Sequence, residues 1–269
     1  MMARILALVL LATISSQPAA EWDQWRTHRH DRLLSDDGWL TLAGLYWLHE
    51  GTNDIAPLHA KFLLKNGRVT LLPNTPLRDD TDPKGATITR AGTLSYQVIK
   101  REDVKGDRFG IRVKDTNSEA RKNFKGLDYF PFNPSYRVTA HFEPYSPAKK
   151  IPITNVLGMT SDETSPGALV FKLNGKTYRL DPIWDMSDPE PRDLFIIFKD
   201  ATSGKETYGA ARYLYAHPPD ANGNTVVDFN KSYNPPCVFT PYATCPLPPQ
   251  QNRLPVRVEA GEKKYAGHA

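Results

Sequence analysis

The sequence predicts a mostly β fold: an antiparallel β-sandwich or partly closed barrel with an N-terminal helix and a long proline-rich C-terminal loop. Short segments rich in β-branched and aromatic residues recur along the chain, which is typical of strands. Asn-Gly stands between two pairs of these segments, at 66–67 and 174–175, and favours the positive φ of a two-residue hairpin turn. No helical pattern of crossover length recurs between the segments, which argues against a parallel sheet.

The expected strands follow each other at short intervals. They are residues 39–48, 62–64, 69–72, 94–100, 109–113, 136–142, 171–173, 177–180, 194–198, 208–215, 226–229 and 256–259. One amphipathic helix is expected before them, over residues 21–34, ending at Asp36, Asp37 and Gly38. Proline is concentrated in residues 234–255, and this segment is expected to lie as a stiff, extended loop over the body because proline cannot join a sheet ladder.

The first twenty residues have the layout of a secretory signal peptide. Arg4 precedes an apolar stretch over residues 5–14, and small residues follow up to Ala20. The apolar stretch is shorter than the roughly 20 residues that span a bilayer. We therefore expect an exported protein, periplasmic or extracellular, with residues 1–20 removed and residues 21–269 forming a single β-rich domain.

The composition narrows the possible partners. The formal net charge is +4, and the basic and acidic residues are interspersed with no run of five like charges, so a nucleic-acid partner is not expected. No later stretch is long and apolar enough for a membrane span. The motifs that bind phosphates, dinucleotides or catalytic zinc are missing, so no cofactor and no metal are expected. The oligomeric state stays open.

Several blocks in the second half carry a family resemblance. They are GLDYFP at 126–131, LFIIFKDATSG at 194–204, YGAARYLY at 208–215 and DFNKSYNPPCVFTPYATCPLPPQQNRL at 228–254. Together they resemble the bacterial family known as domain of unknown function 1684, over about residues 21–264. The resemblance implies a shared fold and a shared site, and no activity.

Polar residues within these blocks are the candidate ligand-binding residues: Arg212, Asp228, Asn230, Asn234, Asn252 and Arg253. Strand alternation places Asp228 and Asn230 on one face. Arg212 stands among tyrosines, and a planar guanidinium in such a setting suits an anionic ligand or a carboxylate of the protein. The structural alternative is that Arg212 and Arg253 pair with Asp200, Asp228 or Glu262 and fix the proline-rich loop to the sheet.

Three functions remain open on these residues. The first is binding of a small anionic or carbohydrate-like ligand between the Arg212 strand, Asp228 and the proline-rich loop, with tyrosines as walls. The second is a cofactor-independent hydrolase or lyase, with Asp228 or Asp200 as the base and Arg212 as the electrostatic stabiliser. The third is a structural envelope protein that uses the proline-rich loop as a docking surface.

Cys237 and Cys245 are the only cysteines of the chain. In an oxidising compartment such a pair most simply forms a disulfide. Free thiols and a catalytic or metal-binding pair are the alternatives, and the spacing fits a metal site poorly because no histidine lies between the two.

Overall fold

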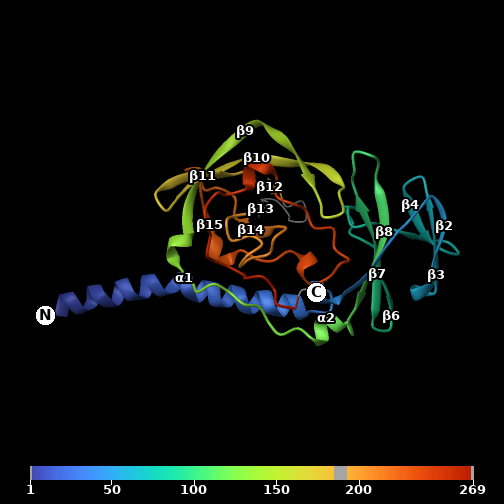
Figure 1. Cartoon of the computed structure of the whole chain (residues 1–269), viewed down its shortest axis with the longest axis horizontal. Helices are drawn as coiled ribbons and strands as arrows, with labels where there is room; N and C mark the ends of the chain where they lie inside the picture. The colour runs from blue at the N-terminus through green and yellow to red at the C-terminus, as the bar shows by residue number, and fades with distance from the viewer. Residues whose placement is uncertain (1, 185–192, 268–269) are drawn as a thin grey trace.

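The computed structural model describes residues 2–184 and 193–267, with side chains from residue 17 onward. A long helix is followed almost entirely by antiparallel strands, in two sheets before residue 116 and two sheets after residue 136 (Figure 1). The expected mostly β fold with an N-terminal helix and antiparallel sheets is thereby confirmed.

The helix α1 (Met2–Leu34) begins well before the expected residue 21 and contains Pro18. From Trp22 onward one face contacts the body, where Trp22, Arg29 and Leu33 are buried. Their spacing of seven and four residues is that of one helical face. Within the described residues, no helix combines the length and the apolar character needed to cross a bilayer.

The first two sheets face each other around an apolar cluster. One has the order β2-β3-β4-β5 and the other β1-β8-β7-β6. The strands are β1 (Leu42–Trp47), β2 (Gly51–Ile55), β3 (Ala60–Lys65), β4 (Arg68–Leu71), β5 (Thr75–Leu77), β6 (Thr89–Ala91), β7 (Leu94–Arg101) and β8 (Arg108–Asp115). Phe62 and Ile111 are fully buried between them, as the alternation of apolar residues predicts.

A short helix, α2 (Glu119–Lys122), leads into the second half, where β9 and β10 arch over a shorter sheet (Figure 1). The sheets have the orders β11-β10-β9-β15 and β12-β13-β14. Their strands are β9 (Arg137–Thr154), β10 (Thr160–Leu173), β11 (Lys176–Leu180), β12 (Ile183–Trp184), β13 (Leu194–Phe198), β14 (Arg212–Ala216) and β15 (Asn224–Asp228). The largest apolar cluster fills the space between them, around Leu169, Phe198 and Phe229.

Several strand predictions need correction. Trp39–Thr41 form a 3₁₀ turn, so the 39–48 strand begins only at Leu42. The 208–215 strand begins only at Arg212, and the 226–229 strand ends at Asp228, after which Phe229–Lys231 form a 3₁₀ turn. Residues 256–259 form no strand, although valine alternates with polar residues there. The reason is that side chains bind this backbone instead of a neighbouring strand: the amide of Val258 donates to Asp200 Oδ2 at 2.7 Å.

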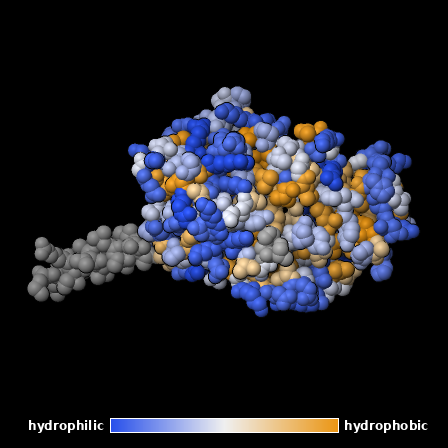
Figure 2. Space-filling model, in the orientation of Figure 1, coloured by the Kyte–Doolittle hydropathy of each residue, from blue (hydrophilic) through white to orange (hydrophobic). Residues whose placement is uncertain are grey.

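The proline-rich loop packs over the body as expected. Its own residues Val238, Ala243, Cys245 and Leu254 are buried against the rest of the protein. Figure 2 shows that the face of the molecule seen in that view is largely hydrophilic, with apolar side chains gathered near its middle. The prediction that residues 21–269 form one domain stays a prediction.

Candidate functional site

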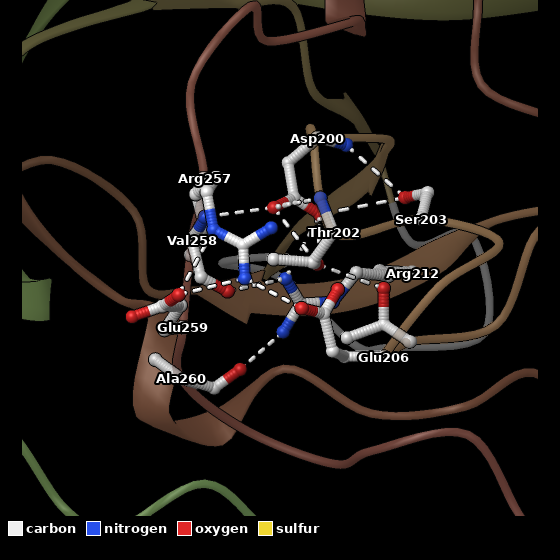
Figure 3. Close-up of polar contacts among 10 residues, drawn as sticks. Asp200, Thr202, Ser203, Glu206, Arg212, Arg257, Val258, Glu259 and Ala260 are labelled. Carbon is white, nitrogen blue, oxygen red and sulfur yellow. Dashed lines mark hydrogen bonds and ion pairs between the residues drawn. The ribbon is translucent and has the colours of Figure 1, made fainter.

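Arg212, the predicted anion-fixing residue, is only 2% exposed. Its Nη1 donates to Asp200 Oδ1 at 3.1 Å and to the carbonyl of Val258 at 3.0 Å, and its Nη2 donates to the carbonyl of Ala260 (Figure 3). Burial lowers the pKa of this guanidinium, and the adjacent Asp200 carboxylate opposes that shift. Arg212 therefore pairs with Asp200, one of the carboxylates that the structural alternative names, but it holds residues 258–260 against β14 rather than the proline-rich loop.

Asp200 is enclosed by the same network. Its carboxylate accepts hydrogen bonds from the amide and hydroxyl of Thr202, from the amide of Val258 and from Arg212. A carboxylate with four protein partners is not placed to take a proton from a substrate. A reaction with Asp200 as base and Arg212 as stabiliser would require this network to open first.

The two loop asparagines bind backbone groups. Asn252 Oδ1 accepts from the amide of Asp181 at 2.8 Å, and its Nδ2 donates to the carbonyls of Asp181 and Ile197, both at 2.9 Å. Asn234 Nδ2 donates to the carbonyl of Lys263 at 2.8 Å. Both side chains are buried, so their polar atoms satisfy the backbone of crossing segments rather than face a cavity.

A second buried ion pair lies beside Asn234. Arg29 of α1 donates from Nε to Glu262 Oε1 at 2.8 Å and from Nη2 to the carbonyl of Asn234 at 3.0 Å. Its guanidinium also stacks over the rings of Trp39 and Tyr233. Arg29 was not among the residues predicted from the sequence, although its position on the same helical face as Trp22 and Leu33 was the available signal.

Arg253 is exposed and does not line the cavity beside Asp228. The residue that follows β13 meets the loop there, because the amide of Leu254 donates to the carbonyl of Lys199 at 2.8 Å. Burial and the nearby Arg253 both lower the pKa of Lys199. Arg253 is thus exposed whereas Arg212 and Asp228 are buried, and ligand binding by the whole predicted set stays a prediction.

Asp228 and Asn230 do meet, though not through strand alternation. The strand ends at Asp228, and the following turn brings the amide and Nδ2 of Asn230 to Asp228 Oδ1 at 3.1 and 2.9 Å. Asn230 also exchanges two hydrogen bonds with the backbone of Asn133. The other carboxylate oxygen of Asp228 accepts from Arg137 Nη1 at 3.2 Å. Of the predicted site residues, Asp228 lines the cavity described next.

This cavity, which we call the β14–β15 cavity, has a volume of about 420 Å³ and lies where β14 and β15 approach α1. Its apolar wall consists of Trp25, Tyr215, Val226 and Tyr233. The rings of Tyr215 and Tyr233 are stacked, with 6.2 Å between centroids and 16° between planes. Tyr215 and Val226 each remain about 40% exposed. Large apolar groups that stay accessible in a recess are typical of ligand pockets.

Charged residues surround this wall. Arg137 lies between two carboxylates, 3.2 Å from Asp228 and 3.6 Å from Glu21. Lys231 also lines the cavity and forms no ion pair with any residue that the structure describes. The cavity therefore offers fixed hydrogen-bond donors and acceptors around an aromatic surface.

A histidine and an aspartate pair at the rim. His217 Nδ1 lies 2.9 Å from Asp193 Oδ1, and the His217 side chain is 90% exposed. When Nδ1 carries the proton that Asp193 accepts, Nε2 is left as a proton acceptor facing solvent. Neither residue was predicted from the sequence, since they lie 24 positions apart and no spacing pattern joins them.

The two cysteines are in near contact. The amide of Cys237 donates to Cys245 Sγ at 3.1 Å. The interaction with Cys245 lowers the pKa of the Cys237 thiol, whereas burial raises that of Cys245. Among the described residues, no three His, Cys, Asp or Glu side chains are grouped in a way that could hold a metal ion.

Comparison with known proteins assigns the second half of the chain to a family. The model of the family described as "Protein of unknown function (DUF1684)" matches residues 122–263, which is more than half of the sequence. The chain belongs to this family. The matched part contains the β14–β15 cavity strands and the proline-rich loop, whereas the resemblance expected over residues 21–121 lies outside it.

A solved structure is also similar to this DUF1684 chain. It is the solution NMR structure of an uncharacterized protein from gene locus rrnAC0354 of Haloarcula marismortui. The two share 31% sequence identity over 55% of this chain and 81% of the other, with a TM-score of 0.45. The search among curated proteins gave no match.

Proposed function

We propose that the protein binds a small carbohydrate-like ligand in the β14–β15 cavity. The observation that carries this proposal is the aromatic wall, in which Tyr215 stacks with both Phe195 and Tyr233 and still remains about 40% exposed in a polar recess. A sugar ring presents apolar C–H faces to such a surface, while its hydroxyl groups both donate and accept hydrogen bonds. Asp228 and Arg137 supply an acceptor and a donor at the same wall.

The charges of the cavity favour a neutral or weakly acidic sugar over a strong anion. Arg137 is already compensated by Asp228 and Glu21, so little of its positive charge is available to a ligand. Lys231 is left to bind a hydroxyl or a single carboxylate group. Of the two predicted ligand classes, anionic and carbohydrate-like, the second fits better.

Calorimetric titration of the mature protein with a panel of monosaccharides and oligosaccharides tests the proposal. A sugar that binds should give a heat of binding in the titration and, in a thermal scan, should raise the melting temperature by mass action. Tyr215→Ala should weaken binding by about tenfold or more because the stacking surface is lost. Tyr242→Ala removes an exposed tyrosine of the proline-rich loop that does not line the cavity, and should leave binding unchanged. Failure of every sugar to bind would favour the third predicted function, a structural envelope protein.

A second candidate is a cofactor-independent hydrolase at the same cavity, favoured by the His217–Asp193 pair. His217 would act as the general base toward water, with Asp193 holding the imidazole orientation. The test is hydrolysis of chromogenic glycosides and sugar esters. Activity that His217→Gln abolishes while sugar binding persists would support it, and equal activity in both proteins would contradict it.

We propose that the protein is exported and loses residues 1–20. The basic start, short apolar stretch and small residues up to Ala20 support this, and Glu21, the first residue of the mature chain, lines the β14–β15 cavity. N-terminal sequencing of the protein from periplasmic and medium fractions is the test. A protein that begins at Met1 in every fraction would contradict the proposal.

We also propose that Cys237 and Cys245 form a disulfide in the exported protein. Two neighbouring thiols lose two electrons and two protons to a disulfide-bearing oxidant by thiol–disulfide exchange. Mass spectrometry after alkylation, with and without reduction, measures the outcome. Full alkylation of both residues in unreduced exported protein would show free thiols instead.

A further inference from the structure

The outer face of the sheet β1-β8-β7-β6 carries a row of polar residues whose positions follow from strand register. The β7–β8 pairing sets Gln97 opposite Arg112 and Ser95 opposite Lys114, and the β6–β7 pairing sets Arg90 opposite Ser95. Directly opposed residues lie on the same face of an antiparallel pair. Three cations therefore share one face, while the opposite face packs the apolar cluster.

These cations line a cavity of about 630 Å³, which we call the β7–β8 cavity. Two carboxylates at its rim are held by arginines that do not line it. Asp36 pairs with Arg121 at 2.9 Å, and Asp37 pairs with Arg32 at 2.5 Å. Lys114 donates to the carbonyl of Asp37 at 2.8 Å rather than to a carboxylate. Positive charge inside the cavity is thus in excess.

Arg112 has no counter-ion among the described residues. Its Nη2 has a long contact of 3.4 Å with Thr244 Oγ1, and its buried Nε has no hydrogen-bond partner. Thr244 Oγ1 accepts a shorter bond from Arg101, whose own carboxylate partner is Asp80 at 2.8 Å. Burial and the nearby Arg101 lower the pKa of Arg112 to about 10. A half-buried guanidinium without an ion-pair partner is costly, which indicates that a partner is missing.

We propose that the β7–β8 cavity is a binding site for a small organic oxyanion, a carboxylate or phosphate ester held by Arg112 and Lys114. The planar guanidinium can donate from two nitrogens to two oxygens of one such group. Ser95 and Gln97 lie directly opposite these cations and can bind the remaining polar groups of the ligand. The volume exceeds what a single inorganic ion fills, so the anion is expected to carry an organic portion.

The site is distinct from the β14–β15 cavity and does not depend on sugar binding there. No residue is shared between the two linings. The β7–β8 cavity also lies before residue 122, outside the part that the family model matches.

The test is calorimetric titration of the mature protein with citrate and with inorganic phosphate at low salt. Citrate should bind, and Arg112→Met should weaken binding by about tenfold or more, with a smaller loss for Lys114→Met. Arg68→Met, which removes an exposed arginine of β4 outside this cavity, should leave binding unchanged. Tyr215→Ala should also bind citrate normally, which separates this site from the proposed sugar site. Comparing phosphate with citrate distinguishes a site for the oxyanion group alone from one that also recognises the organic portion.

Stability without ligand gives a second readout. If Arg112 serves to bind a ligand, the unliganded Arg112→Met protein should melt no lower than the wild type, because a half-buried charge without an ion-pair partner has been removed. The proposal is overturned if neither probe binds the wild type and Arg112→Met melts several degrees lower, since Arg112 is then structural. Equal binding to wild type and Arg112→Met also overturns it, because the anion then binds elsewhere.

Discussion

The two halves of this protein are stabilised by different means. Strands β1–β8 enclose an apolar cluster around Phe62 and Ile111, and few polar side chains are buried with it. The half that follows residue 136 buries a whole ion pair, Arg212 with Asp200, and Glu262 of this half is buried against Arg29 of α1. Apolar packing tolerates changes that keep volume, whereas a buried charged group requires its specific partner. Substitutions that roughly preserve volume should therefore distinguish the halves.

The largest effect is expected for Arg212→Met. The side chain keeps most of its length but leaves Asp200 buried without its cation and the carbonyls of Val258 and Ala260 without their donor. Breaking a buried pair in this way costs about 3–5 kcal/mol of the free energy of unfolding. Urea unfolding at pH 7 measures it.

The matched control is Arg257→Met, an exposed arginine that pairs with Glu206 and Glu259 beside the same segment (Figure 3). It should change stability far less because its ion pairs are exposed to solvent. If both variants lose the same amount, burial of the Arg212 pair is not what stabilises this half.

Asn252→Leu should come next, with a loss of about 2–3 kcal/mol. Leucine has nearly the same shape but leaves the amide and carbonyl of Asp181 and the carbonyl of Ile197 buried without their partner. Gln251→Leu changes the exposed neighbour and serves as the control. A loss in Asn252→Leu no greater than in the control would mean that water replaces the missing partner.

Phe62→Leu tests the apolar half and should cost less than about 1.5 kcal/mol, because the cluster around it can repack with a slightly smaller apolar group. The measurement is the same urea unfolding experiment, read against Asn252→Leu. A loss above that of Asn252→Leu would show that the first half is as strictly specified as the second, and would remove the contrast between them.

The smallest effect concerns an exposed ion pair at the end of α1. The hydrogen bond from Arg32 lowers the pKa of Asp37 to about 2. Because the folded pKa lies below the unfolded value, this contribution is present above about pH 4 and is lost as the pH falls toward 2. Both side chains are more than half exposed, so it should amount to a few tenths of a kcal/mol.

NMR titration of the Asp37 carboxyl group checks this value directly. Arg32→Gln should return the titration midpoint toward 3.8, the ordinary value. A midpoint near 3.8 in the wild type would show that the Arg32–Asp37 ion pair does not form in solution.

The sequence predicted the elements better than it predicted the site. The hairpins at residues 66–67 and 174–175 and the end of the first helix agree with the structure because each depends on neighbouring residues. For the site, alternation along β14 contained an unused signal: Arg212 and Tyr215 differ by an odd number of positions, so their side chains leave the strand on opposite faces. The tyrosine lines the β14–β15 cavity, and the arginine is buried behind it.

By itself, the sequence determined the mostly β class, the leading helix and the proline-rich loop, since periodicity, turn residues and proline act within a few positions. Tertiary structure alone decided which polar side chains pair with each other and which remain available. Arg29 and Glu262 are 233 positions apart, and no local sequence pattern predicts that two residues so far apart will form a contact. Burial removes both groups from water and makes each the other's required partner, whereas Asp228, at the end of its strand, stays beside a cavity.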